Sequence, residues 1–310
     1  LKDKAPEVEL LEGLSVIQHR LGIFRGFVES AVERDGKYYL KAEIGGLTNT
    51  FRFKHKRPVV NLPGIDKFYG KEIRSCLRAD DGETFIGCDL VSLEDTSKRH
   101  YMKPIDPDYV EEMSQPGYDP HLSLALFAGE ITQEQYDNFD KERDHDVAAI
   151  RKSYKVTNYS ATYKVGANKL AREMGISKTK AQSLLDAFWQ KNWAIEKIAS
   201  QQVTKQVGDY TWLRNPVSGF WHELRFDKDR FSTLNQSTGV FIFDSWLARA
   251  RLNGYMGQLS FHDETGASVK DPKWAQEALE KAVDRLNQDL NLNVEIKIDT
   301  QTGDTYAECH

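Results

Sequence analysis

Three short segments carry residue types suited to metal and phosphate chemistry. In the first, Asp89 stands near the end of the apolar run TFIGCDLV, residues 84–91, and Glu94 follows five residues later. A carboxylate at a strand exit is fixed and yet exposed, which suits a hard cation such as Mg²⁺ that binds carboxylates together with substrate phosphates. A helix N-cap is the alternative interpretation of Asp89, because Asp is a common capping residue.

The second segment is a run of four residues spaced four apart: Arg151, Lys155, Tyr159 and Tyr163. This spacing places them on one face of a helix. Two cations and two aromatic rings in one stripe could bind phosphates and stack on a base or sugar. An ordinary basic face with buried tyrosines is the alternative.

The third segment is His262-Asp263-Glu264, directly after the apolar run Leu259–Phe261. Neighbouring carboxylates repel each other, and strands are depleted in both residue types. The stretch could be only a polar hairpin turn. The pair has a chemical purpose if a carboxylate from another segment meets it.

Apolar periodicity and turn residues predict the elements that must position these segments. Helices are expected at 8–33 (one or two), after the NLPG turn through Arg78, at 92–102, from Asp119-Pro120, at 147–174 (one or a pair), from Ser177, at 232–253 and at 272–290. Strands are expected at 37–53 (short, broken by Gly45-Gly46), 84–91, 207–226 (a hairpin), 259–269 (a hairpin) and 294–308 (a pair). Helices interleaved with antiparallel hairpins indicate an α+β fold, with a mostly helical block inserted in the middle.

The composition bounds the class of protein. With 310 residues, 40% of them hydrophobic, the chain can bury a large core in one large domain or two subdomains. A net charge of −5 does not by itself predict a nucleic-acid-binding protein, although the chain has local basic runs such as Lys54–Arg57. Three widely spaced cysteines predict free thiols in a reducing cytoplasm. No apolar run is long enough to span a membrane.

Taken in order, the three segments resemble motifs A, B and C of family A DNA polymerases. Further similarities surround them, in Asn61-Leu62-Pro63-Gly64, Ile73-Arg74-Ser75, Asp119-Pro120-His121, Asn158, Lys169–Arg172, Leu234-Asn235-Gln236-Ser237 and Ala307-Glu308-Cys309-His310. The last of these resembles the end of the replicative polymerases of short-tailed phages. The resemblance spans roughly residues 55–310, and the order of the motifs makes it specific.

The resemblance implies a right-hand architecture with an antiparallel-sheet palm and a mostly helical fingers subdomain inserted in it. The implied subdomains are 1–60 (residual thumb and palm entry), 61–118 (palm with motif A), 119–206 (fingers with motif B) and 207–310 (palm with motif C). The thumb is expected to be truncated, and we find no exonuclease carboxylate set. With the missing initial Met, this indicates a fragment or one subunit of a split polymerase.

The implied activity is template-directed DNA synthesis, in which a deoxynucleotidyl group is transferred to a primer 3′-hydroxyl with two Mg²⁺ ions, or Mn²⁺ in their place. By resemblance, the metal ligands are Asp89, Asp263 and the Leu90 carbonyl. Lys155 is the implied general acid for the pyrophosphate.

The resemblance also assigns substrate contacts. Arg151, Lys155 and His121 would bind the triphosphate of the dNTP. Tyr159 would stack near its sugar and base, with Glu94 packed against Tyr159 where a 2′-hydroxyl would lie. Contacts with primer–template DNA are implied for Arg74, Tyr163, Gln236, His262 and Glu264, the last in a supporting role.

The sequence departs from the family pattern in the residues that surround these sites. Asp95 and Thr96 follow Glu94 without the usual arginine, and Ser160 and Lys164 stand where motif B usually has glycines. Ser232 replaces a common asparagine. The departures leave the metal-site residues intact and bear on fidelity and on the hinge of the fingers.

The sequence bears on three alternative functions. Glu94 and the HDE triplet argue against a single-subunit phage RNA polymerase. The intact Asp89, Lys155 and Asp263 argue against a DNA-binding accessory protein without catalysis. A split enzyme stays open, with a second polypeptide carrying thumb and exonuclease, and a processivity factor as a further partner. The expected location is the cytoplasm of a bacterium, either as its own enzyme or as that of an infecting phage.

Overall fold

The computed structural model describes residues 13–309, so the predicted helix positions 8–12 and His310 lie outside the described residues. The chain divides into two compact units. Within the described residues, the sheet unit comprises 13–93, 239–291 and 296–309, and the helical unit comprises Glu94–Thr238 and Leu292–Glu295. The four subdomains implied by the family resemblance cut the chain differently and stay a prediction.

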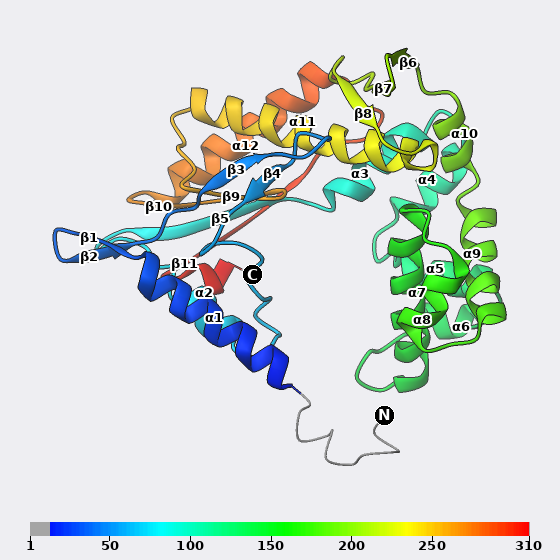
Figure 1. Cartoon of the computed structure of the whole chain (residues 1–310), viewed down its shortest axis with the longest axis horizontal. Helices are drawn as coiled ribbons and strands as arrows, with labels where there is room; N and C mark the ends of the chain where they lie inside the picture. The colour runs from blue at the N-terminus through cyan, green and yellow to red at the C-terminus, as the bar shows by residue number, and fades with distance from the viewer. Residues whose placement is uncertain (1–12, 310) are drawn as a thin grey trace. The chain divides into compact units, whose positions relative to one another are not determined.

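The sheet unit is built around a four-stranded antiparallel sheet (Figure 1). Its strands lie in the order β11 (Ile298–Gly303), β5 (Thr84–Leu90), β10 (Glu264–Val269) and β9 (Leu259–Phe261). Residues 85–88 of β5 are buried, because this central strand has a neighbour on each side. The buried strand predicted at 84–91 is therefore confirmed, and it ends one residue after Asp89.

One long helix packs on this sheet, and part of a second long helix lies in the same unit. Helix α12 (Pro272–Leu290) packs on β5 and β11 through an apolar face that the 272–290 periodicity predicted. It begins where Asp271 accepts a hydrogen bond from the Trp274 N–H at 3.0 Å. Helix α11 (Arg230–Leu252) is joined to α12 by the indole of Trp246, which donates to the Leu279 carbonyl at 3.1 Å.

The N-terminal part of the sheet unit holds smaller elements. They are α1 (Leu14–Ser30), β1 (Val32–Arg34), β2 (Lys37–Tyr39), β3 (Ile44–Leu47), β4 (Phe53–His55) and α2 (Gly70–Ser75). The pairs β1–β2 and β3–β4 are both antiparallel. Gly45 and Gly46 were expected to break a strand, but they lie inside β3, where the pairing with β4 shifts register. A bulge there tolerates glycines that a regular strand would not favour.

The prediction of a strand pair at 294–308 was wrong. Only β11 is a strand, and the TYAE stretch forms the 3₁₀-helix η4 (Tyr306–Cys309). The Glu308 carboxylate accepts a hydrogen bond from the Asp304 N–H at 2.7 Å, which closes the chain into a turn. Tyr306 and Cys309 both enter the core beside Phe85, which an alternating strand could not achieve.

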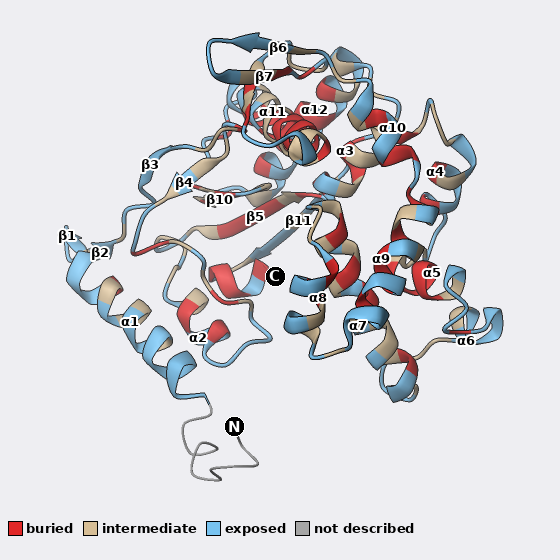
Figure 2. Ribbon diagram, turned by 45° about the vertical axis from the view of Figure 1, so that its right-hand side comes forward, coloured by how far each residue is buried: buried red, intermediate tan, exposed pale blue. Residues whose placement is uncertain are grey.

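The helical unit consists of short helices and a small sheet. Its helices are α3 (Leu93–Met102), α4 (Pro107–Met113), α5 (Pro120–Phe127), α6 (Gln133–Asp137), α7 (His145–Thr162), α8 (Ala167–Met174), α9 (Lys178–Lys191) and α10 (Ala194–Ser200), followed by the 3₁₀-helix η3 (Asp227–Asp229). The predicted basic segment at 147–174 is thus a helix pair, and Ser177 caps α9 as expected. Figure 2 marks the buried residues along these helices, and most of them belong to one hydrophobic cluster.

The small sheet has the order β6 (Thr204–Val207), β7 (Tyr210–Arg214) and β8 (Trp221–Leu224). The hairpin predicted at 207–226 is β7–β8, whereas β6 was not predicted. Antiparallel pairing throughout is consistent with the predicted α+β class. Cys76, Cys88 and Cys309 are free. Across residues 13–309, no helix has both the length and the apolar character that crossing a membrane requires.

Candidate active site

The sheet unit brings the three predicted metal-binding residues together. Asp89 is the penultimate residue of β5, and Asp263 lies in the two-residue turn that joins β9 to β10. The Leu90 N–H donates a hydrogen bond to the Asp263 carbonyl at 3.0 Å. The backbone of motif A is therefore bonded directly to that of motif C, so the two segments that carry the predicted carboxylates meet.

A row of carboxylates crosses the sheet at this position. Glu264 lies directly opposite Asp89 on β10, and Asp299 lies directly opposite it on β11. Side chains at directly opposed antiparallel positions share one face of a sheet. Asp299 was not predicted as a site residue, because only the strand register shows that it is a neighbour of Asp89.

The surroundings of Asp263 in this turn destabilise the negative charge of its carboxylate. Burial raises the pKa of Asp263, and the neighbouring Glu264 carboxylate raises it further, while Arg52 and His262 oppose the shift. A raised carboxyl pKa means that the ionised form is destabilised by its surroundings. A bound cation would reverse that balance.

Metal binding at this position needs ligands from outside the protein. Among residues 13–309, no group of three or more His, Cys, Asp or Glu side chains is arranged to hold a metal ion. Mg²⁺ is commonly bound by one or two carboxylates, with water and substrate phosphates as the other ligands. Asp89 and Asp263, together with a backbone carbonyl, fit an ion of that kind and do not form a closed protein site.

Glu264 is held by a chain of contacts within the sheet unit. The Tyr306 hydroxyl donates to the Glu264 Oε2 atom at 2.9 Å, and burial raises the pKa of Tyr306, so this phenol keeps its proton. The Arg74 guanidinium lies 4.7 Å from the centroid of the Tyr306 ring, and its Nε donates to the Pro63 carbonyl at 2.8 Å. These contacts support the predicted supporting role of Glu264.

His262 occupies the first position of the turn with a φ of 51°, in the left-handed region. Its ring centroid is 6.3 Å from that of His55. Burial, with a smaller contribution from Arg52, lowers the pKa of His262 despite the nearby carboxylates. The imidazole is therefore neutral at pH 7, where it can donate or accept a hydrogen bond.

The predicted stripe in the helical unit is formed by α7. Arg151, Lys155 and Tyr159 lie on this helix, and Tyr163 is its C-terminal cap. Tyr159 is 55% exposed and Tyr163 is 36% exposed, so the alternative of a basic face with buried tyrosines is excluded. Lys155 forms no ion pair with any carboxylate in the described part of the chain, which leaves its ammonium group available to an anion.

Asp119 joins two of the predicted triphosphate ligands. Its Oδ1 caps α5 by accepting from the N–H groups of His121 at 2.8 Å and Leu122 at 2.9 Å. Its Oδ2 accepts from Arg151 Nε at 2.6 Å. Burial alone would raise the pKa of Asp119, but the hydrogen bonds from Leu122, Arg151 and His121 lower it. One ionised carboxylate thus holds the Arg151 side chain and the backbone from which His121 projects.

The His121 ring is fixed from its other side. The Asn158 amide nitrogen is 3.0 Å from His121 Nδ1 and donates to the Pro120 carbonyl at 3.1 Å. Burial lowers the pKa of His121 to about 4, with the Arg151 and Lys155 charges adding to the shift against that of Asp119. A neutral ring that accepts at Nδ1 carries its proton on Nε2, where it can be donated to a phosphate oxygen.

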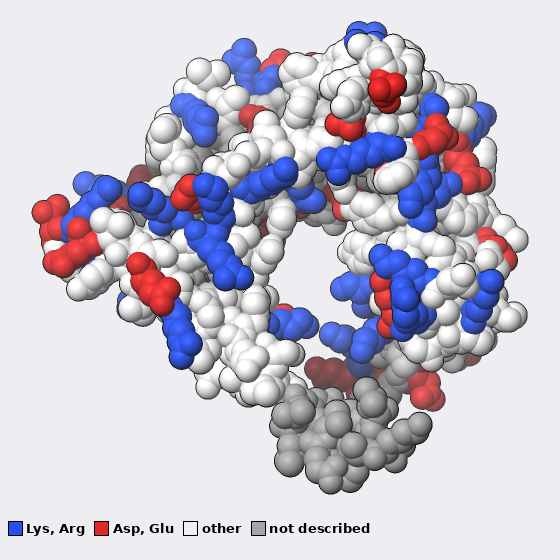
Figure 3. All heavy atoms as spheres, in the orientation of Figure 1, with Lys and Arg blue, Asp and Glu red and all other residues white. Residues whose placement is uncertain are grey.

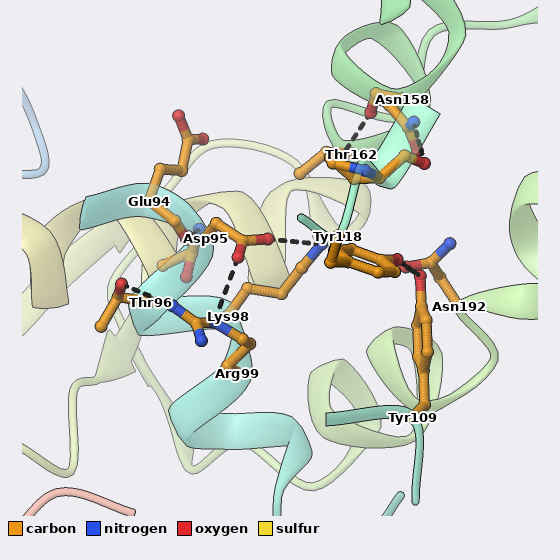
Figure 4. Close-up of polar contacts among 12 residues, drawn as sticks. Glu94, Asp95, Thr96, Lys98, Arg99, Tyr109, Tyr118, Asn158, Thr162 and Asn192 are labelled. Carbon is orange, nitrogen blue, oxygen red and sulfur yellow. Dashed lines mark hydrogen bonds and ion pairs between the residues drawn. The ribbon is translucent and has the colours of Figure 1, made fainter. Parts of the chain in front are cut away.

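Glu94 has a hydrogen-bond partner that the sequence did not predict. It was expected to pack with Tyr159, but its carboxylate accepts a hydrogen bond from the Tyr163 hydroxyl at 2.6 Å. Gln236 Nε2 donates to the same hydroxyl at 3.0 Å. In Figure 4 the Glu94 carboxylate points away from Asp95, which lies 3.0 Å from Lys98 and 3.1 Å from Arg99.

Asn235 also binds Glu94, through a hydrogen bond from its amide to the Glu94 backbone carbonyl at 3.0 Å. Glu94, Tyr163 and Gln236 therefore form one hydrogen-bonded network, with Asn235 securing its backbone. Tyr163 rather than Tyr159 is the aromatic residue that holds Glu94, because the end of α7 brings it within reach of the start of α3.

Lys164 is one of the two residues that stand where the motif B pattern has glycine. It follows the end of α7 with a φ of 54°, a conformation in which glycine is favoured. Its Nζ atom lies 3.9 Å from the Trp189 ring centroid and 2.6 Å from a Glu196 carboxylate oxygen. These contacts offset part of the strain of the left-handed backbone.

Comparison with known proteins identifies a related fold. No protein-family model matches the sequence, and no curated protein matches it. The structure is similar to the POL domain of Pol1 from M. smegmatis, solved in complex with DNA primer-template and dNTP, with a TM-score of 0.74 and 18% sequence identity. The match covers 99% of this chain and 55% of that chain, so this chain spans about half the length of its structural neighbour. Nearly the whole chain therefore has a fold similar to part of a DNA polymerase domain.

Proposed function

We propose that this chain is the palm and fingers portion of a family A DNA polymerase, which extends a primer 3′-hydroxyl by template-directed transfer of deoxynucleotidyl groups. The observation that carries the proposal is the similarity of 99% of the chain to a polymerase domain solved with primer-template and dNTP. The contact between the Asp89 and Asp263 segments is independent support. Similarity in fold does not depend on which side chains a chain carries, whereas this contact brings together two segments with the expected carboxylates.

In this proposal Asp89, Asp263 and the Leu90 carbonyl would hold two Mg²⁺ ions, or Mn²⁺, with phosphate oxygens of the substrate as further ligands. Such ions activate the attacking hydroxyl and stabilise the charge on the leaving oxygen. The raised pKa of Asp263 agrees with a site that is completed by cations. Glu264, held by Tyr306, supports the turn and is not a permanent ligand.

The helical unit supplies the contacts with the triphosphate. Arg151 and Lys155 bind phosphate oxygens, and His121 donates from Nε2. Lys155 also donates a proton to the departing pyrophosphate. Asp119 does not touch the substrate in this scheme, but it orients the Arg151 side chain and caps the helix turn that carries His121, whose ring is held by Asn158.

Selection of the nucleotide falls to the end of the same stripe. Tyr159 is exposed and stacks on the incoming nucleotide, while Glu94 occupies the position that excludes a 2′-hydroxyl. Because the Tyr163 hydroxyl binds the Glu94 carboxylate, the gate is held by the residue that we place beside the template base. Arg74, Gln236 and His262 complete the proposed contacts with DNA.

Positive charge is available to DNA phosphates in each unit. Figure 3 shows Lys and Arg side chains gathered over β3 and β4 in the sheet unit and over the α7–α8 part of the helical unit. Neutralising phosphates with such residues supplies sequence-independent affinity that falls as salt rises. We place the enzyme in phage genome replication in a bacterial cytoplasm, with a second polypeptide for thumb and exonuclease and a processivity factor as partners.

Primer extension tests the proposal. The purified chain is mixed with a labelled primer–template, the four dNTPs and Mg²⁺, and compared with Asp89→Asn and with Asp271→Asn as a control. Asp271 is a helix cap in the sheet unit, so the control makes the same chemical change outside the site. Extension by wild type and control, lost in Asp89→Asn with primer binding retained, supports the proposal. Equal extension by all three proteins, or failure of the wild type to bind the primer, contradicts it. A wild type that binds the primer without extending it would point to a split enzyme that needs its second polypeptide.

A further inference from the structure

The small β6–β7–β8 sheet of the helical unit has two unlike faces. Its inner face is buried, because Leu213 and Leu224 belong to the hydrophobic core of this unit. Side chains alternate along a strand, so the residues next to them in sequence point away from that core. These outer positions are Lys205 and Val207 of β6, Tyr210, Trp212 and Arg214 of β7, and Trp221 and Glu223 of β8. We call these seven residues the outer face.

Strand register places aromatic and basic residues of the outer face beside one another. Lys205 on β6 is directly opposite Trp212 on β7, which is directly opposite Glu223 on β8. Arg214 on β7 is directly opposite Trp221 on β8. Directly opposed side chains on one face of an antiparallel pair are close enough to interact. Each tryptophan therefore has a cation next to it.

The outer face presents its positive charge to solvent. Lys205 and Arg214 are exposed, whereas Glu223, the one carboxylate of the face, is partly buried (Figure 2). Neither cation forms an ion pair with a carboxylate in the described part of the chain. Tyr210 is 59% exposed. Aromatic cross-strand pairs stabilise small sheets, but that role does not require an exposed tyrosine ring.

Trp221 holds the Lys205 side chain against the outer face. The Lys205 Nζ atom lies 4.0 Å from the Trp221 ring centroid, which is a cation–π contact. The contact covers the Trp221 ring and keeps a positive charge next to Trp212. Tyr210 and Trp212 are therefore the rings of this face that a ligand could stack on.

We propose that the outer face binds single-stranded DNA, with bases stacked on Tyr210 and Trp212 and phosphates paired with Lys205 and Arg214. Aromatic rings beside cations are typical of sites for unpaired strands, because every base has a face that can stack. A duplex fits poorly, since its bases already stack on one another. The choice of DNA rests on the proposed function, in which the template is unpaired ahead of the primer. The outer face itself carries none of the residues assigned to that function.

Fluorescence anisotropy of the full chain tests the proposal without dNTPs or Mg²⁺. The probes are a labelled oligo-dT of about 12 nucleotides and a blunt duplex of similar length. Tyr210→Ala should weaken oligo-dT binding by about tenfold, because a stacking partner is lost, and should change duplex binding by less than about twofold. Tyr38→Ala is the control, since Tyr38 is 73% exposed on β2 of the sheet unit. Circular dichroism confirms that both variants are folded.

A second pair of variants tests the phosphate contacts. Arg214→Gln should reduce the slope of the logarithm of oligo-dT affinity against the logarithm of salt concentration by about 0.7, the value for one lost phosphate contact on a single strand. Arg34→Gln, which changes an exposed arginine of β1, is the control and should leave the slope unchanged.

Several results would overturn the inference. No binding of oligo-dT, or equal binding by wild type, Tyr210→Ala and Tyr38→Ala, would leave the outer face to another class of partner, such as a protein. Equal weakening of oligo-dT and duplex binding by Tyr210→Ala would remove the preference for an unpaired strand. Tighter binding of oligo-rU than of oligo-dT would contradict the assignment to DNA. A wild type that extends primers and gives any of these results would retain the proposed function, so the two failures are distinguishable.

Discussion

The two units present opposite electrostatic problems. In the sheet unit Asp89 has a carboxylate opposite it on each neighbouring strand, Glu264 on β10 and Asp299 on β11. In the helical unit Arg151 is already paired with Asp119, while Lys155 remains open. The carboxylate row gathers like charges that a cation would stabilise, whereas Arg151 of the basic stripe is already held by a carboxylate. This difference predicts that the sheet unit decides whether chemistry occurs, and the helical unit decides how well the substrate is held.

Loss of one carboxylate from the turn tests the first half of this comparison. Asp263→Asn should lower the rate of incorporation by about a thousandfold or more, as expected when charge stabilisation of a transition state is lost. Asp299→Asn, which is exposed at the far side of Asp89, should change the rate by less than about threefold, because charge interactions of exposed groups are weak. Single-turnover kinetics measure both. A large effect of Asp299→Asn would show that all three strands contribute to the metal site.

Loss of the Asp119 charge tests the second half. Asp119→Asn keeps a good helix cap for α5 but removes the charge-assisted bond to Arg151. We expect KM for the dNTP to rise about tenfold with a smaller change in kcat, because one such bond is worth roughly one decade. Asp106→Asn, at the cap of α4, is the matched control. Unchanged KM in Asp119→Asn would remove the positioning role, and equal effects in both variants would indicate general destabilisation.

The Glu94–Tyr163 contact gives a smaller, graded effect. Glu94→Ala should raise ribonucleotide incorporation by about tenfold or more, because the proposed barrier to a 2′-hydroxyl is removed. Tyr163→Phe leaves Glu94 in place but removes its 2.6 Å hydrogen bond, so the increase should be about fivefold or less. Tyr38→Phe, which changes an exposed tyrosine of β2, is the control. Competition between labelled ribonucleotide and deoxynucleotide measures the ratio. If Tyr159→Phe changed this ratio and Tyr163→Phe did not, Tyr159 would be the residue that positions Glu94, as the resemblance implied.

The parts of the site formed by residues close in sequence could be predicted, whereas the parts that depend on contacts between distant segments could not. The α7 stripe is local, since four residues at a helical interval define it, and spacing predicted it correctly. The sheet depends on register between strands far apart in sequence, so Asp299 could not be recognised without β11 placed beside β5. The strand predicted at TYAE failed because its pattern carries no information on the Glu308 contact or on burial of Tyr306. The hydrogen bond between Glu94 and Tyr163 was not predicted, because Tyr159 and Tyr163 are only one helical turn apart and the sequence does not show which of them reaches Glu94.

The buried His121 makes the helical unit sensitive to acid. Its pKa is lowered to about 4 in the folded chain, chiefly by burial, so the unfolded chain binds the proton more tightly. The stabilisation from neutral His121 is complete above the unfolded pKa near 6.5 and is lost as pH falls from there toward 4. Between pH 7 and pH 5, the free energy of unfolding measured with denaturant should therefore fall more for wild type than for His121→Gln. Equal losses in the two proteins would show that this histidine does not titrate differently on folding.

The smallest expected effect lies at the end of α7, where two contributions oppose each other. Lys164→Gly removes the ion pair with Glu196 and the contact with Trp189, but it also relieves the left-handed strain. Its free energy of unfolding should therefore stay within about 1 kcal/mol of wild type. Lys164→Ala loses the same contacts and keeps the strain, so it should be less stable than Lys164→Gly by about 1 kcal/mol. Chemical denaturation of the three proteins resolves this order. Equal stability of the Gly and Ala variants would mean that the backbone at 164 is not held in the left-handed region, and Tyr163 would then lack the fixed turn that brings its hydroxyl to Glu94.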